Sequence, residues 1–115
     1  MNIPTEYAAY AAIVGFMLHR FFKMRRVRAQ IPELLKSGAV IVDVRSAAEF
    51  SSGHAPQSIN IPLDQIGKAK SKLDTEKPVV VCCASGTRSG MAVGMLKAQG
   101  FKTVLNAGSW SSLKV

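Results

Sequence analysis

A cysteine followed by a short loop of small residues is the feature of this sequence best suited to chemistry. Residues 79–90 read VVVCCASGTRSG, an apolar strand that runs into a glycine-containing loop between Cys83 and Arg88. Backbone N–H groups in such a loop can turn inward, and the N-terminus of a following helix adds positive potential. Together with the Arg88 cation, these groups should lower the pKa of the Cys83 thiol and make it a nucleophile near neutral pH.

Other polar residues follow the predicted strands and should share an edge with this loop. Ligands of open parallel sheets bind beyond the carboxyl ends of the strands, where Arg45, Asn60 and Asn106 are expected. We expect Asp43 and Arg45 to form an ion pair at this edge. His54 should order the turn before the second strand, because thiolate chemistry needs no general base. Asp43, Arg45 and His54 are therefore only auxiliary candidates.

The neighbouring Cys82 points to the opposite face of its strand, so we expect it to be a core residue. A disulfide between Cys82 and Cys83 would close a strained ring. Counting from Cys82 gives C-x5-R, the cysteine phosphatase signature, but Val81 stands where the usual histidine would precede it. Two cysteines and two distant histidines do not have the spacing of zinc ligands, so no metal site is expected.

Apolar strands alternate with helices along the chain, which predicts an α/β fold with a parallel sheet buried on both faces. Strands are expected over residues 39–44, 58–61, 78–82 and 103–105. Helices are expected over residues 31–36, 46–51, 64–73 and 89–99. The second of these helices should begin at a capping box formed by Ser46 and Glu49.

The loop resembles the active-site signature of the rhodanese family, C-x-x-G-x-R, present as Cys83, Gly86 and Arg88. Three further family stretches stand in order: VDVRSAAEFSSGH at 42–54, SINIP at 58–62 and LNAGSW at 105–110. In the last of them Ser109 replaces the usual second glycine. Four ordered motifs make the resemblance specific over residues 31–115. It implies a rhodanese-like parallel sheet flanked by helices, and sulfurtransferase chemistry.

The resemblance also implies a mechanism of the thiosulfate:cyanide sulfurtransferase type, without a cofactor. Cys83 would take the outer sulfur of thiosulfate or a persulfide donor and pass it, as a persulfide, to a thiol or protein acceptor. Arg88 would contact the donor or brace the loop. Two alternatives stay open, a catalytically silent binding module and a phosphatase that uses Cys82. The N–H groups expected to hold the terminal sulfur are those of Ala84, Ser85, Gly86, Thr87 and Arg88.

Composition indicates one folded domain with an unusually basic N-terminal segment. The chain has 115 residues, of which 48% are apolar, and its net charge is +8. Residues 1–30 contain five basic residues and one acidic residue, and the bases directly follow an apolar run. Nucleic-acid binding is not expected, because no stacking platform or known module is present. The basic residues are Arg20, Lys23, Arg25, Arg26 and Arg28.

The apolar run predicts an N-terminal hydrophobic helix that anchors the protein in a membrane. Residues 7–18 are all apolar or glycine, and residues 3–22 would form a helix about 30 Å long. We therefore expect a transmembrane helix over residues 1–22, a basic linker over 23–30 and a rhodanese domain over 31–115. The positive-inside rule then puts the domain on the cytoplasmic side of the cell membrane. Small residues spaced by four in the helix could support a homodimer.

Overall fold

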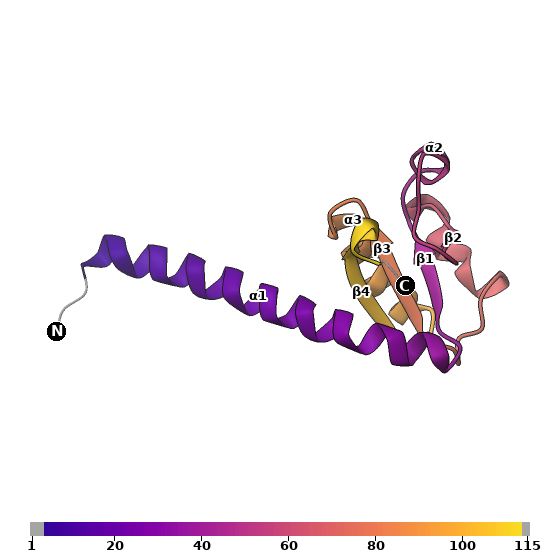
Figure 1. Ribbon diagram of the computed structural model, residues 1–115, viewed down its shortest axis with the longest axis horizontal. Coiled ribbons are helices and arrows are strands. Elements are labelled where there is room, and N and C mark those ends of the chain that lie inside the picture. Colours follow the sequence, from indigo (N-terminus) through magenta and orange to yellow (C-terminus); the bar gives the residue numbers. More distant parts are fainter. Residues whose placement is uncertain (1–3, 114–115) are drawn as a thin grey trace.

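The computed structural model describes residues 4–113 and contains a sheet of four parallel strands in the order β2-β1-β3-β4 (Figure 1). This confirms the predicted α/β fold with helices flanking a parallel sheet. The strand bounds lie within a few residues of those expected, although the last strand extends further toward the C-terminus. The strands are β1 (Val40–Asp43), β2 (Ile59–Asn60), β3 (Val79–Cys83) and β4 (Val104–Ser109).

One face of the sheet packs against helix α3 (Thr87–Ala98) and segment η1 (Leu63–Ser71). Every residue of β3 is buried, because apolar side chains from both faces of this central strand enter a core. Segment η1 is a 3₁₀ helix with non-helical backbone at Lys68, where the sequence predicted an ordinary helix. The side chains buried on this face include Val42, Ile66, Val79, Val81, Cys83, Ala92 and Leu96.

The opposite face of the sheet is covered by the C-terminal turns of helix α1 (Thr5–Lys36) and by the chain end around segment η2 (Trp110–Ser112). The buried cluster there joins Ile31 of α1 to Leu113 across the sheet residues. Because side chains alternate along a strand, the two adjacent cysteines enter different cores. This second cluster contains Ile31, Ile41, Ala55, Val80, Cys82, Ala107 and Leu113.

Helix α1 is a single helix of 32 residues, and its N-terminal part extends away from the sheet (Figure 1). The predicted short helix 31–36 forms its last turns, and residues 23–30 are helical as well. Residues 23–30 read KMRRVRAQ and consist largely of strong helix formers, so the helix continues through them. The helix also continues through Pro32, which lies inside α1.

The expectation of a transmembrane helix over residues 3–22 is wrong. Within residues 4–113, no helix combines the length and the apolar character needed to cross a membrane. The physical reason is that the fully apolar stretch is short, and a longer window takes in Glu6, Arg20 and Lys23. The predicted cell-membrane location and its cytoplasmic orientation are withdrawn with it. Residues 1–3 and 114–115, the ends of the predicted N-terminal and C-terminal domains, lie outside the described residues.

Candidate functional site

Cys83 is the last residue of β3. Its side chain is fully buried and lies beneath the loop that leads into α3. Its sulfur accepts a hydrogen bond from the Gly86 N–H at 2.9 Å and lies 3.3 Å from the Ser89 hydroxyl. Gly86 has a φ of +102°, a left-handed conformation that glycine adopts without strain. An inward N–H group therefore faces the sulfur, while Ala84 and Thr87 of the same loop are exposed.

The surroundings of Cys83 hold the pKa of its thiol below the ordinary value. Burial raises this pKa, but the Ser89 hydroxyl and the backbone N–H groups of Ser89, Gly86 and Ser85 lower it by more. The sequence predicted that Arg88 would help lower this pKa, whereas the structure gives the largest lowering contribution to Ser89. The motif gives no indication of Ser89, because this serine lies one residue beyond the signature.

Asn106 on β4 connects the Ser89 hydroxyl to the loop. The hydroxyl lies 2.7 Å from Asn106 Oδ1, and Asn106 Nδ2 donates to the Gly86 carbonyl at 3.2 Å. The Ser89 hydroxyl has one hydrogen and two acceptors in reach, Asn106 Oδ1 and the Cys83 sulfur. An ionised sulfur attracts that hydrogen more strongly than a neutral one, so thiolate formation should turn the hydroxyl toward Cys83.

Arg88 holds α3 to helix α2 (Ala47–Ser51) through a paired contact with Glu49. Its two terminal nitrogens donate to the two Glu49 carboxylate oxygens at 2.7 and 3.0 Å. The Arg88 hydrogen bond is the largest cause that lowers the pKa of Glu49 to about 2. Glu49 also completes the predicted capping box with Ser46. The ion pair thus connects the start of α3 to α2. The sequence indicated Glu49 only as a capping residue and not as the partner of Arg88.

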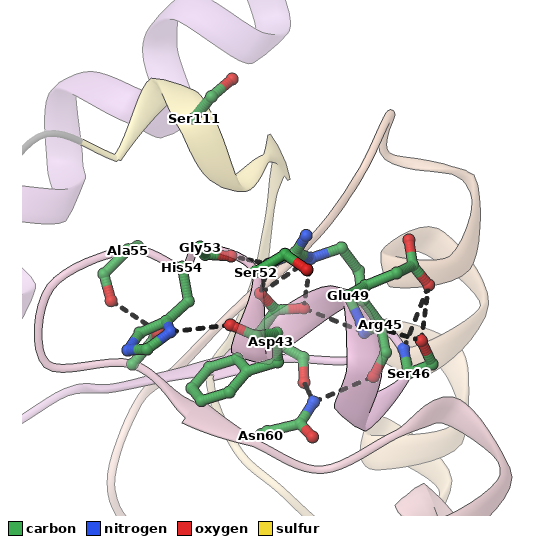
Figure 2. A network of polar contacts seen from close by, with 12 residues as sticks. Asp43, Arg45, Ser46, Glu49, Ser52, Gly53, His54, Ala55, Asn60 and Ser111 are labelled. Atoms are coloured by element: carbon green, nitrogen blue, oxygen red, sulfur yellow. Dashed lines mark hydrogen bonds and ion pairs between the residues drawn. The ribbon is translucent and has the colours of Figure 1, made fainter.

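Asp43 and Arg45 form a buried ion pair at 2.8 Å, as the sequence predicts (Figure 2). The Arg45 guanidinium also donates to the Gly53 carbonyl at 2.6 Å and lies 4.6 Å from the centre of the Trp110 ring. These contacts connect the end of β1 to the turn after α2 and to the C-terminal segment. The pair therefore fixes three segments at the carboxyl edge of the sheet.

His54 and Asn60 order the same edge, His54 within its own turn and Asn60 across the neighbouring strands β2 and β1 (Figure 2). The His54 ring stacks on Phe50 with ring centres 3.9 Å apart, and its Nδ1 lies 2.9 Å from the Phe50 carbonyl oxygen. Asn60 Nδ2 donates to the carbonyls of Asp43 and Arg45. His54 is thus held within its own turn, in agreement with the ordering role predicted for it.

Cys82 differs from Cys83 in the groups around its sulfur and in the direction of its pKa shift. It lies in the core between the sheet and α1, and both cysteines are free thiols. Burial, followed by the nearby Asp43, raises the pKa of the Cys82 thiol to about 12. The Gly86 N–H points to the sulfur of Cys83. The geometry therefore favours a loop that begins at Cys83.

Comparisons with known proteins agree with this fold. A rhodanese-like domain is matched over residues 28–114. The YqhL protein of Bacillus subtilis is 32% identical over 101 residues, covering 84% of this chain and 80% of the relative. The thiosulfate sulfurtransferase GlpE of Pseudomonas savastanoi is 41% identical over 75 residues, covering 65% of this chain and 71% of the relative.

A solved structure extends the likeness to three dimensions. The human single-domain sulfurtransferase TSTD1 superposes with a TM-score of 0.64 at 26% identity, covering 72% of this chain and 88% of that one. Named sulfurtransferases among these relatives support sulfurtransferase activity in general for the chain. On the family match and the 32% identity to YqhL, the chain belongs to the rhodanese-like family.

Proposed function

We propose that this protein carries a transferable sulfur atom as a persulfide on Cys83, taken from thiosulfate or a persulfide and passed to a thiol or a protein acceptor. One observation carries the proposal: a buried sulfur faces the Gly86 N–H and the Ser89 hydroxyl, which hold its pKa below the ordinary value. Residues 31–115 would form the catalytic unit, and the family match over 28–114 supports this boundary.

The proposed reaction has two balanced steps. The Cys83 thiolate attacks the outer sulfur of thiosulfate, a new S–S bond forms, and the bond to the sulfonate breaks, so that sulfite leaves with the electron pair. The terminal sulfur of the persulfide is then anionic. An acceptor thiolate attacks that sulfur, forms its own S–S bond and releases the Cys83 thiolate. With this order of steps, ping-pong kinetics are expected.

The loop contacts support both steps of this proposal. The N–H groups that now face the Cys83 sulfur are donors of the kind that stabilise an anionic atom without reorganisation. Since Cys83 lies beneath the loop surface, the outer sulfur of the persulfide would extend toward the exposed residues Ala84 and Ser85. Arg88, bound to Glu49, would keep the start of α3 in place during this exchange rather than bind the donor.

Two matched serine variants test which cysteine reacts. Thiosulfate-dependent sulfur transfer to a thiol should be lost in Cys83→Ser and retained in Cys82→Ser, while circular dichroism shows that both variants are folded. The opposite pattern would support the phosphatase-like loop that begins at Cys82. Failure of the folded wild-type protein to turn over any donor would support the silent binding module instead.

A further inference from the structure

The outer edge of β4 is open along its first residues. The strand order places β4 at one end of the sheet, and within residues 4–113 it pairs with β3 alone. The Val79 N–H donates to the Thr103 carbonyl, so the carbonyl of Thr103 faces β3. Because the backbone groups alternate in direction along a parallel strand, the N–H and C=O groups of Val104 and Asn106 face away from β3. This edge therefore presents main-chain donors and acceptors with which a further strand could pair.

The open edge lies in a groove between two helices. Helix α1 leaves the domain on the side of β4 (Figure 1), and α3 packs on the other face of the sheet. The groove has a volume of about 570 Å³, within the range of sites that bind ligands. We call it the β4 groove; it lies between residues 16–27 of α1, Val93 and Lys97 of α3, and residues 104–106 of β4.

The β4 groove carries positive charge on both sides of the strand edge. Arg20 and Lys23 line it from α1 and Lys97 lines it from α3, while none of the described residues that line it is acidic. Among residues 4–113, these three cations have no ion-pair partner. Apolar side chains accompany them on each side, Met24 on α1 and Val93 on α3. An extended segment directs successive side chains to opposite faces, so its acidic and apolar side chains would meet complementary groups on both helices.

We infer that the β4 groove binds an extended acidic segment of another protein, which adds a fifth strand to the sheet beside β4. Main-chain hydrogen bonds to Val104 and Asn106 fix this segment, and its acidic side chains bind the cations of the two helices. Pairing between the β4 edges of two copies of this chain does not fit, because it would bring the cations of two identical grooves together.

The β4 groove reaches the hydrogen-bond network that holds the Cys83 loop. Asn106 lines the groove, and its side chain contacts the Ser89 hydroxyl and the Gly86 carbonyl. A protein bound in the groove is therefore placed beside this loop. Binding does not require the Cys83 sulfur, which does not line the groove, so Cys83→Ser should bind the same segment as well as the wild type does.

Peptide binding to the full chain, measured by fluorescence anisotropy, tests the proposal. The probe is a labelled peptide in which valine and glutamate alternate, and a peptide in which valine and lysine alternate should not bind. Reversing two cations in Lys23→Glu with Lys97→Glu should weaken binding of the glutamate peptide about tenfold. Arg25→Glu with Arg26→Glu is the matched control, because it changes the net charge equally at residues that do not line the groove, and it should bind like the wild type. Circular dichroism checks that each variant is folded.

N-methylated peptides test whether the segment binds as a strand. Alternate N–H groups of a strand face opposite edges, so a peptide methylated on every second nitrogen keeps one edge free and should still bind. The same peptide methylated on every nitrogen keeps its charge but has no free edge, and it should not bind. If it binds like the unmodified peptide, the groove recognises charge alone and the proposal is overturned. A folded wild-type protein that binds the glutamate peptide no better than the lysine peptide would also overturn it, as would a double variant at Lys23 and Lys97 that binds like the wild type.

Discussion

Replacing Ser89 with alanine is the sharpest test of why Cys83 would be a nucleophile. The Ser89 hydroxyl lies 3.3 Å from the sulfur and is the largest cause that lowers the pKa of this thiol. A hydrogen bond to a charged group contributes about 1.5–3 kcal/mol. Because the contact is long and Asn106 competes for the same hydrogen, we expect Ser89→Ala to cost the thiolate the lower end, about 1.5 kcal/mol, and so to raise the pKa of the Cys83 thiol.

The rate of alkylation by iodoacetamide as a function of pH measures this change, since only the thiolate reacts. A Cys82→Ala background leaves Cys83 as the only thiol, and intact mass follows its modification. The midpoint of the profile should move to higher pH in Ser89→Ala. Ser85→Ala is the matched control, because Ser85 acts on the sulfur through its backbone N–H, which alanine retains.

An unchanged or lower midpoint in Ser89→Ala would refute this reasoning. It would mean that the Ser89 hydroxyl keeps donating its hydrogen bond to Asn106 Oδ1, and that its oxygen accepts a hydrogen bond from the neutral Cys83 thiol instead. The nucleophile would then depend on the loop N–H groups alone.

Three further substitutions test the contacts around the loop. Arg88→Gln should raise the pKa of Glu49 from about 2 part of the way toward 4.5, because the Ser46 hydrogen bonds to Glu49 remain. The depressed pKa adds stability above pH 4.5 that is lost toward pH 2, so this pH dependence should weaken. A carboxyl titration by NMR that still gives about 2 would contradict this prediction. Arg45→Met leaves the buried Asp43 carboxylate without its partner and should cost about 3–5 kcal/mol of unfolding free energy in urea; a loss below about 1 kcal/mol, typical of exposed pairs, would argue against a structural role. Gly86→Ala forces a φ of +102° on a residue with a Cβ, so the backbone at residue 86 should shift and turn its N–H away from the Cys83 sulfur. Loss of this hydrogen bond should raise the pKa of the Cys83 thiol. An alkylation profile like that of the wild type would argue against a role of the residue 86 N–H in stabilising the thiolate.

Much of the fold could be predicted from local patterns in the sequence. The strand that ends at Cys83 is short, β-branched and bounded by a proline and a glycine-containing loop, so its burial and its position followed from the residues themselves. The capping box at Ser46 also depends on two residues three apart. Such features are local, and the structure contains them where they were expected.

The individual contacts that complete the site are not local, so the sequence placed Asn106 at the same edge as the loop but did not indicate which side chains bind one another. Glu49 lies 39 residues before Arg88, and Asn106 lies 17 residues after Ser89. Only the parallel pairing of β3 with β4 brings Asn106 beside the loop. The membrane interpretation failed because it depended on the hydrophobicity of the apolar run alone. The charged residues Glu6 and Arg20 on either side of this run leave too short an apolar stretch to cross a membrane.

Mass spectrometry of the protein after exposure to thiosulfate tests the central claim most directly. The reduced protein should gain the mass of one sulfur atom, fragmentation should place it on Cys83, and an acceptor thiol should remove it. Cys82→Ala should still gain the atom and Cys83→Ser should not. A folded wild-type protein that gains no sulfur from thiosulfate or from a persulfide, or that gains it on Cys82, would contradict the account.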